Sequence, residues 1–567
     1  MKNNTWWTKK SFIITVRLNM KTSTTTSDRF VWYQESLDSI KWSFSWPLSG
    51  ILKYYEKDVN TVMNISFFEK GSRNINQQDI DNIQTFLSLS LARSIVLEKD
   101  IENDWLLNTA QKNFLLHTLR HIQLWLKMLE YTVYIEANKW WYNLSDTDKE
   151  KYLIEIEKYE TLLYGPSIHA IPGESRSVLN HIWDLYMSNW SLLSHQEQAT
   201  IKDFFLTHNF SPKKGGGEKK EKKENNSVLN KQISSDTLRQ ILEKVYNIYG
   251  EDIVSIYESS EAESPTFDKE NNRYIIPTWI HSKDLKEFYH EYMIAEKTKV
   301  IMSDIATNFS VGRRKDEYFD DHTIKFPANN NYEIKRVCEL IDHEVGTHFV
   351  RNKNSSLWVD IKSGWYLETE EGIATANEQL ASGDRENLAA DEPTIHHLST
   401  FIAEKYDAWM TKKILEILFV LQWEDREKSK KLAHDRMLRV KRFHAFDLPW
   451  ANRKDVVYWR GMKNVVEYLQ NTDIAKLKKD TKLLYSWKFS DKDMDYIDWL
   501  FDWLDIDTDK YISPLALGKM ICHKYTGNNV NKKTLAQQDL RFDSPLTELN
   551  YTQKKKLIEI LDILQKD

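Results

Sequence analysis

Residues 341–349 read Ile-Asp-His-Glu-Val-Gly-Thr-His-Phe and contain two histidines, His343 and His348, with Glu344 directly after the first. Zinc hydrolases use such a set, because neutral imidazoles bind the metal and a neighbouring carboxylate takes a proton from water. The common spacing is i, i+4, whereas the spacing here is i, i+5, which places the side chains about 140° apart on a regular helix. We therefore predict one π-type turn, helped by Gly346, that returns both histidines to one face.

The same stretch also fits a helix that carries two incidental histidines. Val337, Leu340 and Val345 recur at the spacing of residues that pack into a core. A chance HExxxH pattern is expected in on the order of a few per cent of chains of this length and histidine content. The motif alone leaves both interpretations open, and a third metal ligand is needed to separate them.

Residues 366–378 offer that ligand. They begin a helix rich in small residues, with the acidic pair Glu370-Glu371 near its start, followed by Gly372 and Ala374. Small residues let two helices approach closely, so Glu371 is the predicted third ligand of a His₂Glu zinc site, and Glu370 is either a supporting group or exposed. The alternative is that both acids only complement the helix N-terminus.

These segments, 343–351 and 369–374, resemble the HE[IV]GTHxxR and T[EQ]EG[LI]A motifs of the microtubule-associated tyrosine carboxypeptidases and their bacterial relatives. Residues 436–439 and 453–461 resemble the later RxxR and KDxxYxxG segments of that family, so the likeness extends from about residue 230 to 530. The resemblance implies a zinc metallopeptidase with zinc on His343, His348 and Glu371 and with Glu344 as catalytic base. It implies hydrolysis of the C-terminal peptide bond of a peptide or protein, an aromatic C-terminal residue being one option.

A carboxypeptidase also needs a cation for the terminal carboxylate of its substrate. Arg453, Lys454 and Arg460 are the predicted substrate-binding residues, and Arg460 and Tyr458 are predicted to act beside Glu344 in catalysis. The alternative for each cation is an ion pair with Asp455 or another acid.

The overall pattern predicts an α+β fold that is mainly helical, with a small β-sheet next to the HExxxH helix. We expect a disordered N-terminus (1–29), a separate helical N-terminal region (30–210), a Lys/Glu/Gly-rich linker or loop (211–227) and a zinc metallopeptidase-like domain (228–567). Strands are predicted over 252–257, 273–280 and 322–326, and Pro277 restricts the second to a sheet edge. Capping boxes predict helix starts at Thr147 and Ser194.

Composition excludes several classes of protein. The 567 residues contain 78 Lys and Arg against 84 Asp and Glu, which argues against a nucleic-acid partner. Two cysteines cannot form a disulfide framework, and no apolar run reaches about 18 residues, so we expect a cytoplasmic protein without a transmembrane segment. The oligomeric state is left open.

One alternative function and two further patterns complete the sequence analysis. The alternative function is a non-catalytic zinc-binding regulatory or interaction protein, whose helical N-terminal half recruits a partner. Residues 505–516 resemble the start of a calcium loop but lack its glycine and its last acid, so calcium is not predicted there. The pair His396-His397 is interpreted as a surface pair, because adjacent side chains diverge on a helix.

Glycine is scarce, at 16 residues, and tryptophan is abundant, at 21. One hypothesis is that some of these tryptophans come from a codon that the native host reads as glycine. The alternative is a lineage that uses little glycine.

Overall fold

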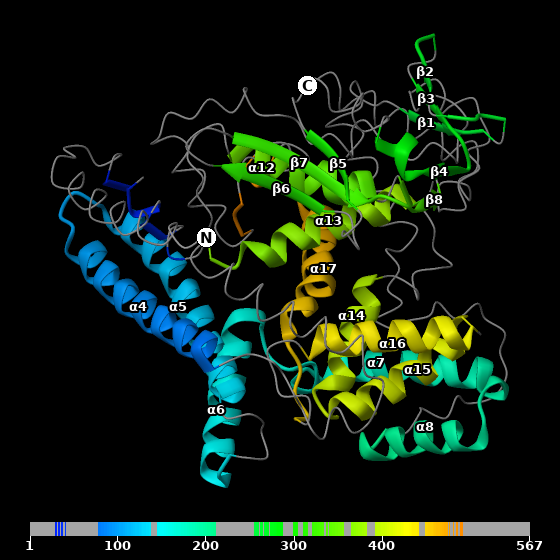
Figure 1. Ribbon diagram of the computed structural model, residues 1–567, viewed down its shortest axis with the longest axis horizontal. Coiled ribbons are helices and arrows are strands. Elements are labelled where there is room, and N and C mark those ends of the chain that lie inside the picture. The colour runs from blue at the N-terminus through cyan, green and yellow to red at the C-terminus, as the bar shows by residue number, and fades with distance from the viewer. Residues whose placement is uncertain are drawn as a thin grey trace.

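A computed structural model describes residues 77–137, 144–210, 299–303, 310–315 and 320–333, and, with gaps, 29–40, 255–286, 336–382, 392–441 and 448–490. Helices dominate these residues and the β content is small, which confirms the predicted mainly helical α+β class (Figure 1). Residues 1–28 of the predicted disordered N-terminus, the linker at 211–227 and the calcium-like loop lie outside the described residues. Arg29, the last residue of that predicted N-terminus, is helical and pairs with Asp104, so the predicted boundary is wrong by one residue. Within the described residues, every helix is too short or too polar to cross a bilayer.

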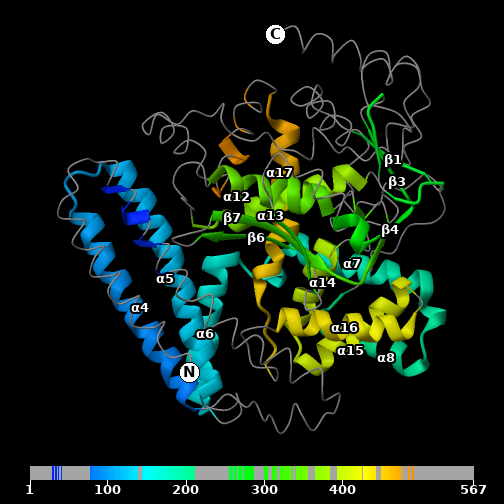
Figure 2. The ribbon, with the colours of Figure 1, turned by 45° about the horizontal axis from the view of Figure 1, so that its top comes forward.

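The N-terminal half forms helices α4 (Gln77–Asn103), α5 (Thr109–Ala137), α6 (Asp146–Tyr164), α7 (Pro172–Asn189) and α8 (His195–Thr207), with short 3₁₀ turns η2 (Ile168–Ala170) and η3 (Trp190–Leu192). Helices α4 and α5 lie side by side (Figures 1 and 2). The capping box at Ser194 is confirmed, since its hydroxyl accepts from the Glu197 backbone N–H and the Glu197 side chain accepts in return. The box predicted at Thr147 is wrong by two residues, because Ser145 caps α6.

The strands of the described residues form three small sheets. Strands β1 (Ser255–Glu258), β3 (Arg273–Ile276) and β2 (Thr266–Asp268) pair in that order, β4 (Trp279–His281) pairs with β8 (Asn331–Glu333), and β7 (Asp320–Pro327) lies between β5 (Lys299–Ser303) and β6 (Ser310–Lys315). The β5–β7 pairing is parallel and the β6–β7 pairing is antiparallel. The edge position expected from Pro277 is wrong: β3 is a central strand, and Pro277 follows its last residue, where its missing N–H removes no ladder bond.

The second half continues with η6 (Ile341–Phe349), α12 (Val350–Ser355), α13 (Tyr366–Ser382), α14 (Glu392–Ala403), α15 (Ala408–Trp423), α16 (Arg426–Val440), η8 (Arg453–Asp455) and α17 (Val456–Asn471). Strand β6 contacts η6, so a small sheet does lie next to the HExxxH helix. In both ribbon views, β6 and β7 lie beside α12 and α13 (Figures 1 and 2).

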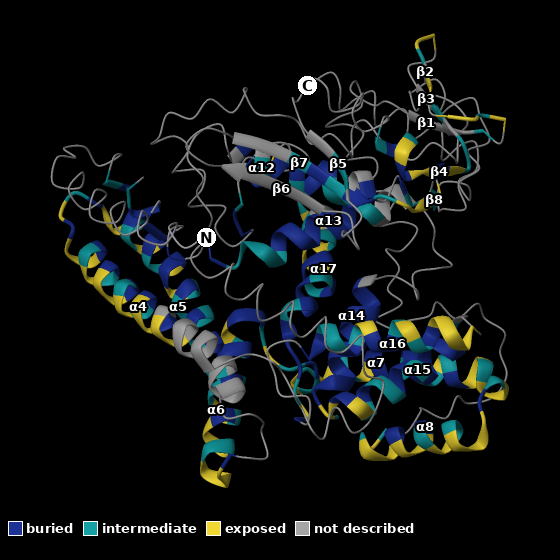
Figure 3. Ribbon diagram, in the orientation of Figure 1, coloured by how far each residue is buried: buried dark blue, intermediate teal, exposed yellow. Residues whose placement is uncertain are grey.

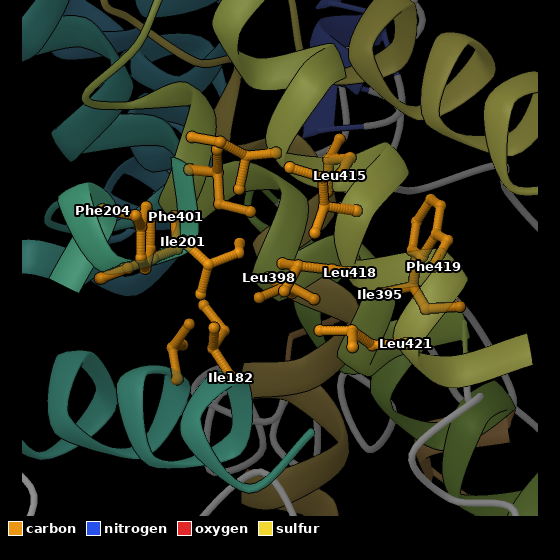
Figure 4. Close-up of a cluster of buried hydrophobic side chains, with 14 of the residues drawn as sticks. Ile182, Ile201, Phe204, Ile395, Leu398, Phe401, Leu415, Leu418, Phe419 and Leu421 are labelled. Atoms are coloured by element: carbon orange, nitrogen blue, oxygen red, sulfur yellow. The ribbon is translucent and has the colours of Figure 1, made fainter. Parts of the chain in front are cut away.

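One hydrophobic core joins the two halves of the chain. Ile182 of α7 and Phe204 of α8 pack in the same buried cluster as Phe401 of α14 and Leu418 of α15 (Figure 4). In Figure 3 much of α15 is coloured as buried. The expected separation of the helical N-terminal region therefore does not hold for α7 and α8, which complete the core of the helical body. The helical periodicity of the sequence predicts which face of each of these helices is apolar, but it does not predict which helix packs against that face.

Two histidines in this half, the buried His181 and the largely buried His169, make stability sensitive to acid. Burial lowers the pKa of His181 in α7 from 6.5 to about 4, and burial likewise lowers the pKa of His169 to about 4. Each ring is neutral in the folded chain, whereas an unfolded histidine binds a proton near pH 6.5, so unfolding takes up protons between these values. The free energy of unfolding should be highest above pH 6.5 and fall towards pH 4, by up to about 3 kcal/mol per histidine.

Urea unfolding at a series of pH values from 7.5 to 4.5 measures this slope. His181→Gln should flatten it, whatever its effect on stability at neutral pH. The same slope in the variant and the parent protein would rule out a contribution from His181.

Trp365, which precedes α13, bears on the codon hypothesis. Its backbone has φ +60°, in the left-handed region that glycine adopts freely and a bulky residue rarely does. Its indole packs 4.4 Å from the His117 ring and its Nε1 donates to the Leu162 carbonyl, so the side chain nevertheless has partners. Trp105 and Trp279 are 83% and 61% exposed, which is also unusual for tryptophan.

The hypothesis predicts glycine at position 365 in the protein made by its native host. Peptide mass spectrometry of protein purified from that host identifies the residue directly. Tryptophan at every one of the 21 positions where the sequence has it would refute the codon hypothesis.

Candidate metal centre

His343 and His348 lie on one face because the helix that carries them is a π-helix. Residues Ile341–Phe349 form η6 in the π conformation, and regular α-helix resumes at Val350. One extra residue per turn brings the i, i+5 pair together, and the two ring centroids are 5.2 Å apart. The predicted widening between the two histidines is confirmed, and it extends over the whole motif rather than a single turn.

Glu371 of α13 completes a set of three donors. Its Oε2 lies 3.4 Å from the Nε2 of His348 and 3.8 Å from the Nε2 of His343. One donor atom from each residue falls within 4.8 Å of the other two. Ligands around a tetrahedral zinc ion, at about 2.0–2.1 Å from the metal, lie about 3.3 Å apart, so only a small contraction would seat one.

The surroundings of the Glu371 Oε2 atom support the binding of a cation between the three donors. Glu371 Oε2 is buried, and no donor among the described residues reaches it with hydrogen-bond geometry. A buried carboxylate oxygen without a partner is costly, and a metal ion would remove that cost. Two imidazoles and a carboxylate also form the donor set that zinc prefers for catalytic sites. The three residues therefore fit a zinc ion.

Two further carboxylates hold the other nitrogen of each imidazole. His343 Nδ1 lies 2.9 Å from Glu378 Oε2, and His348 Nδ1 lies 2.9 Å from Glu370 Oε1. Each contact makes Nδ1 a donor and leaves Nε2 with its lone pair towards Glu371, as metal-binding histidines require. Glu370 is buried and also pairs with Lys488 Nζ at 2.9 Å, so of the two roles predicted for it, support rather than exposure is correct.

Glu344 occupies the position of a proton acceptor. Burial raises the pKa of its carboxyl, the nearby histidines oppose this shift, and Glu371 and Glu378 add to it. A carboxyl whose pKa is raised is a better base for catalysis near neutral pH than an ordinary one. The residue that zinc hydrolases use as base thus has the environment that this role needs.

Helix α13 is set against α17 by a contact between two glycines. A Cβ on Gly372 would lie 2.8 Å from the Gly461 Cα and closer still to its carbonyl group. A Cβ on Gly461 would fall 3.0 Å from the Gly372 Cα and inside contact distance of the Glu368 carbonyl oxygen. The two backbones touch, and the position of Glu371, next to Gly372, depends on this close crossing.

Gly461→Ala should therefore destabilise the protein by about 1–3 kcal/mol, because one methyl group overpacks the crossing. It should also weaken zinc binding, since α13 must move away from α17. Chemical unfolding and titration with zinc measure the two effects. Gly173→Ala in α7 is the matched control, because its Cβ meets nothing within 4 Å; equal stability of the two variants would contradict the proposed crossing.

Tyr458 lies near the metal donors. It is three residues before Gly461, so both lie on the side of α17 that faces α13. Burial raises the pKa of its hydroxyl well above 10, and the charges of Glu371 and Glu344 are among the further causes. The phenol stays protonated at neutral pH and can donate a hydrogen bond, and its role in catalysis stays a prediction.

The three cations predicted for substrate have other contacts. Arg453 is 2% exposed, and its guanidinium pairs with Glu404 at 2.7 Å and with Glu157 at 2.5 Å. Arg460 pairs with Glu174 at 2.9 Å and donates to the carbonyls of Tyr164 and Pro166. Lys454 is half-buried, and its backbone N–H donates to Asn452 Oδ1. For Arg453 and Arg460 these contacts favour the ion-pair alternative, with acids that the sequence could not specify.

The interpretation of His396 and His397 as a surface pair is wrong. His396 is 3% exposed and His397 is fully buried. His397 Nε2 lies 3.2 Å from Glu174 Oε2, and Arg436 Nη1 lies 3.2 Å from His396 Nδ1. Adjacent side chains do diverge on α14, but both directions lead into packed structure, because α14 is covered by α7, α16 and α17.

Sequence reasoning missed Glu378 and Lys488. Glu378 is seven residues after Glu371, two helical turns along the same face, so helical spacing could have identified it. Lys488 lies far along the chain, and no local pattern marks it.

Comparison with protein-family models, with curated proteins and with solved structures found no match for this chain. The family resemblance given above therefore remains a prediction that rests on its motifs.

Proposed function

We propose that this protein is a zinc-dependent metallocarboxypeptidase that hydrolyses the C-terminal peptide bond of a peptide or protein. The observation that carries the proposal is the convergence of His343, His348 and Glu371, with the half-buried carboxyl of Glu344 beside them. A binding-only site needs the three donors but has no use for Glu344. Its position and environment therefore favour hydrolysis over the alternative of a non-catalytic regulator.

A zinc ion held by these donors would polarise the scissile carbonyl and increase the acidity of a water molecule. Glu344 then accepts a proton from the attacking water as the new C–O bond forms. Tyr458, kept neutral by burial, donates a hydrogen bond to the carbonyl oxygen as negative charge develops on it. When the C–N bond breaks, Glu344 delivers the proton to the leaving amine, so that one water is consumed and two products are released.

Glu370 and Glu378 keep the two imidazoles in the orientation that this chemistry needs. Burial raises the pKa of Glu378, but its bond to His343 and the neighbouring Arg336 outweigh this effect, and the net pKa is about 2. The carboxylate therefore stays ionised at neutral pH and continues to accept from His343 Nδ1.

A library of peptides with free C-termini tests the proposal. The zinc-loaded protein should remove C-terminal residues, and a chelator should stop the reaction until zinc is restored. Mass spectrometry of the products identifies the bond that is cleaved and the preferred C-terminal residue. A protein that retains zinc and cleaves none of the peptides would overturn the proposal and leave the regulator.

A further inference from the structure

The π-helix η6 needs support from outside, because the same residues can also form a regular α-helix. A π-helix is rare, so its presence over Ile341–Phe349 requires contacts that favour it over the α form. In a regular α-helix Thr347, at i+4, would lie about 40° from His343 around the axis, whereas His348 would lie about 140° away. Thr347 would then share the face of His343. The helical register therefore decides which of these two neighbours faces Glu371.

Asn377 of α13 binds Thr347. Its Nδ2 donates to Thr347 Oγ1 and to the Tyr485 hydroxyl, each at 2.8 Å, so the two N–H groups of one amide are both used. Thr347 is fully buried and Asn377 is 2% exposed, so water does not compete for these hydrogen bonds. Loss of the Thr347 hydroxyl would leave an N–H of Asn377 without that acceptor in a place that water does not reach, which is costly.

The bond to Thr347 restrains the backbone more directly than the contacts to the two histidines do. Glu378 contacts His343 Nδ1 and Glu370 contacts His348 Nδ1, each at 2.9 Å. Those contacts join flexible glutamate side chains to rings that also rotate. Threonine carries its hydroxyl on Cβ, a single rotatable bond from the backbone, and its branched side chain is stiff. A hydrogen bond to that hydroxyl therefore fixes the rotation of residue 347 about the helix axis.

The turn after Thr347 is held on the same side. Arg351 Nη2 donates to the Phe489 carbonyl and Asn354 Nδ2 donates to the Tyr485 carbonyl, each at 2.9 Å. These two residues follow Thr347 at i+4 and i+7, so they continue its face of the helix. Tyr485 binds Asn377 through its hydroxyl and Asn354 through its carbonyl. The face that carries Thr347 is thus directed to Asn377 and Tyr485, away from the metal donors.

We propose that Asn377 is a positioning residue for the zinc site on which the proposed function rests, because its bond to Thr347 fixes the π register of η6. With that bond in place, Thr347 faces Asn377 and His348 faces Glu371. Without it, residues 341–349 relax towards an α-helix, in which His348 turns away from His343 and Thr347 takes its place. Asn377 is not one of the three donors and acts on them through the backbone of η6.

Thr347→Val tests this role, because valine has nearly the shape of threonine and lacks the acceptor oxygen. Competition with a zinc-binding dye measures the dissociation constant of zinc, which should rise by roughly 10–100-fold. Thr347→Ser keeps the hydroxyl and should bind zinc nearly as tightly as the parent protein. Asn377→Ala removes the donor instead and should weaken zinc binding as Thr347→Val does, so it decides the question if Thr347→Val does not fold.

Thr375→Val is the matched control. Thr375 lies on α13 and is 1% exposed, and its hydroxyl has no hydrogen-bond partner among the described residues. The same substitution there should leave the affinity for zinc unchanged. Equal losses of affinity in Thr347→Val and Thr347→Ser would show that packing, not the hydrogen bond, is responsible, and would overturn the inference.

Hydrogen exchange of the zinc-free protein separates the role of Asn377 from the proposed function. Thr347→Val should speed exchange of the backbone amides of residues 346–350 by roughly tenfold or more, and Thr347→Ser should not. If zinc binds equally well to the parent protein and to the folded valine variant, the inference is wrong and the proposed function stands. If the parent protein binds no zinc, the proposed function is wrong and exchange decides the inference: equal rates in parent and variant overturn it.

Discussion

Glu344→Gln is expected to lower the rate of peptide hydrolysis by roughly 10²–10⁴-fold while zinc stays bound, because glutamine has the same shape but cannot accept a proton. The three donors His343, His348 and Glu371 are untouched by the change, and the carbonyl oxygen of the new amide has the size of the carboxylate oxygen. Elemental analysis of the purified variant gives the zinc content, and single-turnover kinetics gives the rate of the chemical step.

Glu368→Gln is the matched control for this change. Glu368 lies on α13, three residues before Glu371, and its carboxylate accepts from Asn464 Nδ2 at 2.7 Å at the surface. The Glu368→Gln substitution removes one negative charge from the same region but leaves Glu344 in place. The rate of peptide hydrolysis of this variant should therefore stay close to that of the parent protein. A Glu344→Gln protein that keeps both its zinc and its full rate would show that another group takes the proton.

Arg453→Met should lower the free energy of unfolding by about 3–5 kcal/mol. The substitution keeps most of the side-chain volume but leaves the Glu404 carboxylate buried without its cation. Burial already raises the pKa of Glu404 against the opposing charge of Arg453, so removing that charge should favour its protonated form. Urea unfolding at pH 7 measures the loss.

Two further variants show whether the loss comes from the unpaired charge. Arg453→Met combined with Glu404→Gln should recover a good part of the stability, because no buried charge is then left alone. Arg426→Met breaks a more exposed pair with Glu197 and should cost no more than about 1 kcal/mol. A small loss for Arg453→Met, similar to that for Arg426→Met, would contradict the assignment of Arg453 to the core.

The metal centre could be predicted from the sequence because its information is local. The spacing of His343 and His348 requires a widened helix, and a short helix with a paired acid and small residues supplies Glu371. Both are consequences of helical geometry over a few residues. The identity of the metal, the reaction and the family are not tested by the fold and stay predictions.

The contacts of Arg453 and Arg460 could not be predicted in this way. Their partners Glu157 and Glu174 are separated from them by 296 and 286 positions along the chain. Helical and strand periodicity reports which face of an element is buried, but not which distant element covers it. The same limit explains why His396 and His397 were expected at the surface and why α7 and α8 were expected to form a separate region.

The carboxylate of Glu174 binds two groups at once, Arg460 and His397, and through Arg460 it holds the beginning of α17. The acids of α6 and α7 thus act as internal counter-ions for the second half of the chain. Expression of residues 228–567 alone would leave these cations without their counter-ions and would expose the apolar faces of α14 and α15 to solvent. Composition suggests 211–227 as a boundary at which to divide the chain for expression. Division there would separate the two halves of one hydrophobic core. We therefore expect either fragment to fold only when the two are co-expressed.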